Sequence, residues 1–178
     1  VLFPTFSRIQ DDRPRVAIAY LRCTQAVAAI TVPMMTGLWI LSDPFVRALY
    51  GEAWTPMIPI LQVLCPVGAV QSIGTLNGTL YLSQGRSGRQ LVVGTIVGVL
   101  GLGAVALGLR HGLMGVAGYY AIFSLIVFLP SVQMAVSVVG INVFDVLRNL
   151  RNVIACSAVM GFVVFALDRW GLANANPW

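Results

Sequence analysis

Residues Gly68–Gln90 read GAVQSIGTLNGTLYLSQGRSGRQ. Uncharged polar side chains are spaced along an otherwise apolar stretch, which is predicted to be a helix and is followed by two arginines. Polar groups at membrane depth are costly unless they face protein or a hydrated cavity. This stretch therefore predicts a membrane-spanning helix with one polar surface that is turned away from lipid.

The composition of the whole chain agrees with a membrane setting. Its 178 residues are 58% hydrophobic and 10% charged, and the mean hydropathy is +0.86. Soluble domains are about 45–50% apolar and about 25% charged. We therefore expect an all-α integral membrane protein. A net charge of +5 would suggest nucleic acid as a partner of a soluble domain, but here the arginines lie between apolar spans, where they set topology.

Apolar stretches of about 20 residues can cross a bilayer as helices. The chain contains about five such stretches, which we place at Tyr20–Leu41, Ile58–Ser83, Leu91–Leu109, Leu113–Val139 and Val153–Leu167. Two amphipathic stretches, Asp43–Trp54 and Gly140–Asn152, are too short to span and are expected to lie at the membrane interface.

These stretches divide the chain into three parts. Residues 1–19 are expected to hold the cytoplasmic end of a preceding helix and a polar loop, and residues 20–139 four spans. Residues 140–178 are expected to hold an amphipathic linker, a further span and a truncated tail. Because the chain begins with Val1 and ends in an unfinished-looking loop, we expect it to be a piece of a longer protein.

The arginines are distributed unevenly between the two sides that five spans define. Three loops on one side hold Arg8, Arg13, Arg15, Arg86, Arg89, Arg148 and Arg151. The other side holds Arg47, Arg110 and Arg169. Because loops rich in arginine stay in the cytoplasm, the first side is predicted to be cytoplasmic.

Catalytic chemistry is not indicated. His111 is the only histidine and lies in a turn, and Cys23, Cys65 and Cys156 are isolated from one another in the sequence. No metal-ligand spacing, nucleophile motif or phosphate-binding loop is present, so neither a cofactor nor an enzyme activity is expected.

The polar helix carries the candidate binding residues. Gln71, Thr75, Gly78 and Thr79 have the i, i+4, i+7, i+8 spacing of one helical face. With Asn77 from the same helix, this face could line a hydrated cavity for a sugar-like substrate, because amides and hydroxyls both donate and accept hydrogen bonds. Hydrogen bonding between helices explains the same pattern equally well.

Three arginines near the predicted cytoplasmic side are further candidates. Arg86 and Arg89 follow the polar helix, and Arg22 lies one turn into the first span. A guanidinium group can bind a diphosphate through paired hydrogen bonds. The alternative role is to set topology and contact lipid headgroups.

Three stretches, taken in order, resemble a known family. They are VLFPTFSRIQDD (residues 1–12), DPFVRALYGEAWTPMIPILQVL (residues 43–64) and QSIGTLNGTLYLSQGR (residues 71–86). They are similar to the C-terminal half of bacterial polysaccharide flippases, the lipopolysaccharide and exopolysaccharide repeat-unit translocases of the MOP superfamily.

The resemblance implies a fold of about twelve to fourteen helices in two pseudo-symmetric lobes around a central cavity. It implies that the whole protein moves undecaprenyl-diphosphate-linked oligosaccharides across the bacterial inner membrane by alternating access. The implied partners are that lipid, membrane lipids, and the polysaccharide polymerase and export machinery. This chain would supply helices nine to thirteen, and half of the cavity would lie outside it.

Other functions stay open at this point. A multidrug exporter of the same superfamily is the nearest alternative, and a non-transporting membrane scaffold is another. A membrane-embedded glycan polymerase or ligase would need a large periplasmic loop, and the loops here are short. If the polar helix lines the site, Gln71→Leu is expected to impair export more than Ser131→Leu.

Overall fold

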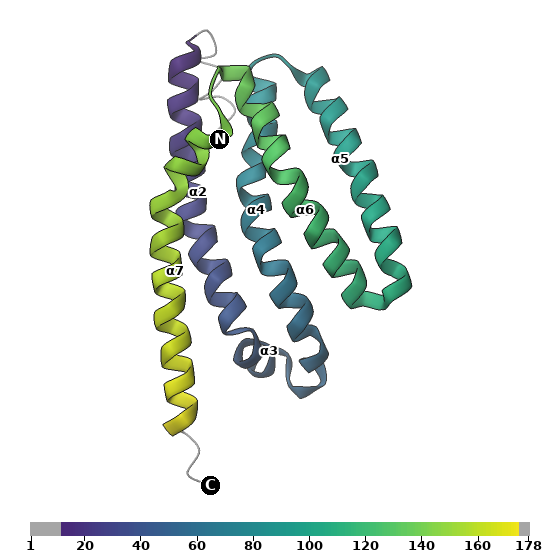
Figure 1. The fold of residues 1–178 in the computed structure, drawn as a ribbon, viewed down its shortest axis with the longest axis vertical. Coiled ribbons are helices and arrows are strands. Elements are labelled where there is room, and N and C mark those ends of the chain that lie inside the picture. Colours follow the sequence, from purple (N-terminus) through teal and green to yellow (C-terminus); the bar gives the residue numbers. More distant parts are fainter. Residues whose placement is uncertain (1–11, 175–178) are drawn as a thin grey trace.

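The computed structural model describes residues 12–174. These residues form a bundle of long helices joined by short connections (Figure 1). In order, the elements are α2 (Arg13–Ile40), α3 (Ser42–Tyr50), η1 (Glu52–Met57), α4 (Ile58–Ser83), α5 (Ser87–Gly108), η2 (Leu109–His111), α6 (Gly112–Val136), η3 (Ser137–Val139) and α7 (Val143–Asn174). Arg8 and most of the first motif lie outside the described residues.

Four continuous helical stretches of the described chain are long and apolar enough to cross a membrane. They are Pro14–Ile40, Glu52–Ser83, Ser87–Val139 and Val143–Asp168. The third is 53 residues long and contains both α5 and α6, which turn at η2 and run side by side (Figure 1). The expected all-α membrane fold with about five long helices is therefore confirmed.

The helix α4 lies at the centre of the bundle. It packs against α2 on one side and α6 on the other, while α7 packs against α2 and α5 against α6. The buried core follows this order, with Tyr20 of α2, Ile73 and Leu80 of α4, Val132 of α6 and Val146 of α7 in one cluster. The helix α5 is covered by α6 on one side and leaves large apolar side chains such as Leu91 and Leu102 exposed, as a lipid-facing helix does.

The ends of the bundle match the loop grouping expected from the arginines. The start of α2, the α4–α5 turn and the connection from α6 to α7 lie at one end, and α3 and η2 lie at the other (Figure 1). Arg86 and Arg89 therefore share an end with Arg148 and Arg151.

The first span begins earlier than expected. Instead of a loop up to Ala19, α2 starts at Arg13, because Asp12 caps the helix through a 3.2 Å hydrogen bond from the Arg15 backbone N–H to Oδ1. Pro14 is compatible with this start, since the first helical turn needs no backbone donor there.

The short helix α3 occupies most of the stretch expected at the interface. It ends at Gly51, whose φ of 84° favours glycine. At this end of the bundle Arg47 hydrogen-bonds the exposed carboxylates of Asp43 and Glu52. The Glu52 hydrogen bond, followed by that of Asp43, raises the pKa of Arg47.

The amphipathic linker and the last span are not separate elements. Both belong to α7, a single helix of 32 residues that replaces the expected linker at Gly140–Asn152 and span at Val153–Leu167. The helix can start at Val143 because its first backbone donors are satisfied. Gln133 Oε1 accepts from the Val143 N–H at 2.7 Å, and Asp145 Oδ2 accepts from the Asn142 N–H at 2.9 Å.

Candidate functional site

A cavity of about 440 Å³ lies between α4, α5 and α6, and we call it the α4–α5–α6 cavity. Its uncharged polar lining consists of Gln71, Thr75, Asn77, Tyr81, Gln90, Tyr120, Ser124 and Ser131. Apolar groups such as Val93, Phe123 and Val127 complete the wall. Its volume is in the range of roughly 300–1,000 Å³ that small-molecule sites occupy.

Three of the four candidates on the polar helix line this cavity. Gln71, Thr75 and Asn77 face it from α4, and Gly78 of the same face contributes its backbone. Thr79 is not among the residues that line this cavity. The helical spacing thus predicted a common surface for most of these side chains, but the role of each in binding stays a prediction.

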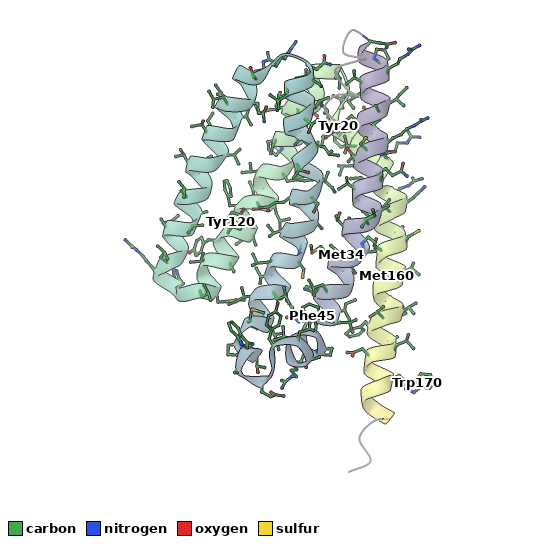
Figure 2. All side chains as sticks on the ribbon, turned by 180° about the vertical axis from the view of Figure 1, so that it is seen from behind. Tyr20, Met34, Phe45, Tyr120, Met160 and Trp170 are labelled. Carbon is green, nitrogen blue, oxygen red and sulfur yellow. The ribbon has the colours of Figure 1, made fainter. Side chains whose placement is uncertain are left out.

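Two of the three lining residues also hold neighbouring helices. Gln71 Nε2 donates a 2.6 Å hydrogen bond to the Tyr120 hydroxyl of α6, and the Tyr20 hydroxyl of α2 donates a 2.8 Å bond to Asn77 Oδ1. Figure 2 shows Tyr120 near the middle of the bundle and Tyr20 nearer to the end at which α2 begins. Both interpretations of the polar face therefore apply to the same residues, which line a cavity and bridge helices.

Thr75 uses its hydroxyl differently. It donates to the Ser72 carbonyl of its own helix at 2.7 Å, and a hydroxyl that donates in this way keeps its capacity to accept a hydrogen bond. Ser72 likewise bonds within α4, to the Gly68 carbonyl. These hydroxyls are internally satisfied donors that can still accept a hydrogen bond.

Gln90 is a cavity residue that the sequence analysis did not single out. It lies in the first turns of α5, and its Nε2 atom is 3.0 Å from the position that a Cβ would take on Gly78. Its Oε1 atom is buried, and none of the residues in 12–174 supplies it with a hydrogen-bond donor. Gly78 thus allows α5 to bring a buried amide close to α4.

The three candidate arginines are not gathered at the α4–α5–α6 cavity. Arg89 lines an adjacent cavity of about 510 Å³, here called the Arg89 cavity, together with Tyr81, Val92, Val93, Met134 and Ser137. Arg22 lies on α2 with Arg15 and Cys23, around a separate hollow of about 330 Å³. Arg86 lines none of the described cavities.

The turn that carries Arg86 and Arg89 has a defined geometry. Gly85 has a φ of 65°, the Arg86 N–H bonds the Tyr81 carbonyl at 2.9 Å, and the Gly85 N–H bonds the Leu82 carbonyl at 3.1 Å. This is the Schellman arrangement that ends a helix at a left-handed glycine. It sets where α5 begins, and so where Arg89 and Gln90 stand relative to α4.

A further cavity of about 360 Å³ is almost wholly apolar. It lies among α2, α4, α6 and α7, and its lining includes Val32, Trp39, Ile73, Phe128 and Ile154. It offers few groups that could orient a polar ligand.

The residues missed from the sequence share one signal. Tyr20, Tyr120 and Gln90 are single polar side chains at or near the ends of long apolar runs, or within them. Tyr20 and Tyr120 each meet a partner that is distant in the sequence, and Gln90 meets Gly78 across the α4–α5 turn, so no periodicity within one helix identifies their roles. Within the described part of the chain, no three His, Cys, Asp or Glu side chains gather into a group that could hold a metal ion.

Parts of the chain are similar to proteins of polysaccharide biosynthesis. Residues 1–59 match the family described as polysaccharide biosynthesis protein. The teichuronic acid biosynthesis protein TuaB of Bacillus subtilis is 29% identical over 169 residues, which is 94% of this chain and 35% of that protein.

Two other relatives match shorter segments. The lipopolysaccharide biosynthesis protein WzxC of Escherichia coli is 38% identical over 86 residues, 48% of this chain and 18% of that protein. The succinoglycan biosynthesis transport protein ExoT of Rhizobium meliloti is 41% identical over 64 residues, 36% of this chain and 13% of that protein. The chain thus spans about a third of the relatives' length or less. No solved structure matches the chain.

Proposed function

We propose that this chain belongs to the polysaccharide flippases and forms part of one lobe of a transporter that moves a lipid-linked oligosaccharide across a membrane. The family assignment rests on the matches to polysaccharide biosynthesis proteins and agrees with the motif order in the sequence. The carrier we propose is undecaprenyl diphosphate, the membrane is the bacterial inner membrane, and the direction is from the cytoplasmic to the periplasmic leaflet.

The observation that carries the proposal is the uncharged polar lining of the α4–α5–α6 cavity. Amide and hydroxyl groups from three helices converge there within an otherwise apolar, membrane-length bundle. Such groups suit a sugar, whose hydroxyls donate and accept hydrogen bonds and carry no charge. Gln71 and Asn77 also bridge helices, whereas the hydroxyl of Thr75 bonds within its own helix and Gln90 Oε1 has no donor among the described residues, so the lining offers more polar groups than these two interhelical hydrogen bonds use.

The proposed orientation follows from the arginines. Arg86, Arg89, Arg148 and Arg151 lie at the same end of the bundle, and arginine-rich ends remain in the cytoplasm. In this orientation the cytoplasmic end is where a newly made lipid-linked oligosaccharide would enter. The polymerase and export machinery would then receive it on the other side.

The test uses the intact gene. Deleting it is expected to trap undecaprenyl-diphosphate-linked oligosaccharide with its sugar in the cytoplasmic leaflet, where externally added glycan-modifying enzymes do not reach it in intact spheroplasts. Restoring the gene is expected to release the trapped lipid and restore surface polysaccharide.

Normal lipid distribution and normal polysaccharide in the deletion strain, in a background without other flippase genes, would contradict the proposal. Loss of resistance to toxic compounds in the same strain would then favour a multidrug exporter. A strain that changes in neither respect would point to a membrane scaffold.

A further inference from the structure

The α4–α5–α6 cavity and the Arg89 cavity share two wall residues. Tyr81 of α4 and Val93 of α5 line both of them. The two spaces are therefore neighbours separated by these side chains, and together they extend from an arginine at the end of the bundle to the amide of Gln71 farther along α4.

We infer that the two cavities form one binding site for a saccharide carried on a phosphate, in which Arg89 binds the phosphate and Gln90 binds a sugar hydroxyl. This inference rests on the proposed function and adds to it the location of the two halves of the ligand. It places the site within a single lobe, between α4, α5 and α6.

Two consecutive residues of α5 can contact both the phosphate and the sugar of the ligand. Arg89 and Gln90 are neighbours in the first turns, and successive helical residues point about 100° apart around the axis. Accordingly, Arg89 lines one cavity and Gln90 the other. A ligand lying across Tyr81 and Val93 would meet both side chains at once.

The two cavities of the proposed site differ in the charge of the side chains that line them. Among the described residues, Arg89 is the sole charged one that lines its cavity, and none with a charge lines the α4–α5–α6 cavity. A guanidinium group binds phosphate oxygens through two parallel hydrogen bonds. A neutral cavity with amides, hydroxyls and aromatic rings accepts a neutral, hydroxyl-bearing group instead.

The buried oxygen of Gln90 specifies the kind of partner it needs. Oε1 is an acceptor without a donor among the described residues, and a buried acceptor is costly when it stays unpaired. In the proposed complex the Gln90 amide turns toward the cavity, and a sugar hydroxyl supplies the missing donor. Asn77 and Thr75 on the facing helix line the same space and can bind further hydroxyls.

The experiment measures lipid affinity of the purified full-length protein by native mass spectrometry. The probes are the undecaprenyl-diphosphate-linked oligosaccharide extracted from the deletion strain and undecaprenyl diphosphate without sugar. Gln90→Met, which keeps the length of the side chain, is expected to weaken binding of the glycosylated lipid by about threefold to tenfold and to leave the bare lipid unchanged. Arg89→Gln is expected to weaken both lipids by about tenfold.

A second pair of variants tests the space itself. A Cβ on Gly78 would meet Gln90 Nε2 at 3.0 Å, whereas a Cβ on Gly98 of α5 meets nothing within 4 Å. Gly78→Ala is therefore expected to weaken the glycosylated lipid selectively, and Gly98→Ala is the matched control. Unchanged melting temperatures show that each variant is folded.

Two results would overturn the inference, and they are distinguishable. If Gln90→Met and Arg89→Gln bind both lipids as the wild type does, while the deletion strain still traps the lipid, the flippase function stands and this site is wrong. If the wild-type protein binds neither lipid and the deletion strain traps none, the proposed function fails and the site fails with it.

Discussion

The hydroxyl of Tyr20 donates a 2.8 Å hydrogen bond to Oδ1 of Asn77, and so joins α2 to α4 across 57 positions of sequence. Tyr20 is fully buried in the core. Asn77 at the same time lines the α4–α5–α6 cavity. One amide therefore serves both the packing of the bundle and the wall of the candidate site.

Removing this hydroxyl should cost stability. Tyr20→Phe keeps the ring but leaves Asn77 Oδ1 without its donor, and hydrogen bonds between membrane helices contribute about 0.6 kcal/mol on average and up to about 1.7. We expect a loss of that size in the unfolding free energy of the full-length protein in detergent. Tyr50→Phe is the control, because Tyr50 is 54% exposed on α3. Equal effects of the two variants would show that the bond contributes nothing measurable.

Gln71 should matter for export more than a glutamine elsewhere on the bundle. Gln71→Leu removes the bond to Tyr120 and replaces an amide of the cavity wall with an apolar group. We expect surface polysaccharide export to fall by about threefold to tenfold, in line with the loss of one or two hydrogen bonds. Tyr120→Phe, which removes only the acceptor hydroxyl, is expected to have the smaller effect.

The matched control for that experiment is Gln25→Leu. Gln25 is exposed on α2 and lines none of the described cavities. Ser131→Leu, the comparison that the sequence suggested, is not a neutral reference, because Ser131 lines the same cavity as Gln71. Export that is equally reduced, or equally normal, in the Gln71 and Gln25 variants would remove Gln71 from the site.

Gly161 should be required for the contact between α7 and α2. A Cβ at this position would lie 2.8 Å from Thr36 Cγ2 and 3.3 Å from Ile40 Cδ1. Thr36 is β-branched and cannot easily move away, so Gly161→Ala is expected to destabilise the protein by about 1–3 kcal/mol. Gly118→Ala in α6 meets nothing within 4 Å and is expected to be neutral or slightly stabilising. Thermal unfolding of both variants tests this, and a Gly161→Ala protein as stable as the wild type would show that the contact between α2 and α7 accommodates an added methyl group.

Gly85 should be required for the turn before α5. Its φ of 65° is unfavourable for other L-residues, so Gly85→Ala is expected to cost roughly 1–2 kcal/mol. Gly98→Ala lies within α5, where alanine is favoured over glycine and a Cβ meets nothing within 4 Å, and serves as the control. Because the turn positions Arg89 and Gln90, the Gly85 variant should also bind the glycosylated lipid less well than the Gly98 variant. A Gly85→Ala protein with unchanged melting temperature would contradict the role of the turn.

Local signals in the sequence account for much of the helical architecture. The bounds of α4 were predicted to the residue, because an uncharged apolar run is closed on one side by Pro59 and on the other by the glycine turn at Gly85. The stretch expected at Asp43–Trp54 is shorter as a helix, because α3 ends at Tyr50, where Gly51 takes a positive φ. The division of the C-terminal region was wrong, because residues 143–160 contain no proline or glycine that would interrupt α7. The start of this helix at Val143 is capped by Gln133 of α6. That partner is ten positions away and lies outside any local pattern.

The sequence by itself determined the fold class, the number of long helices, the end at which the arginines gather and the polar face of α4, because each of these depends on composition or on helical periodicity. Only the tertiary structure decided what that face meets. It brought Tyr20 and Tyr120 to the amides of Asn77 and Gln71, and it placed Gln90 against Gly78 while separating Arg22 from the other candidates. These contacts join residues on different helices, and they depend on how the helices pack rather than on the order of residues within any one of them.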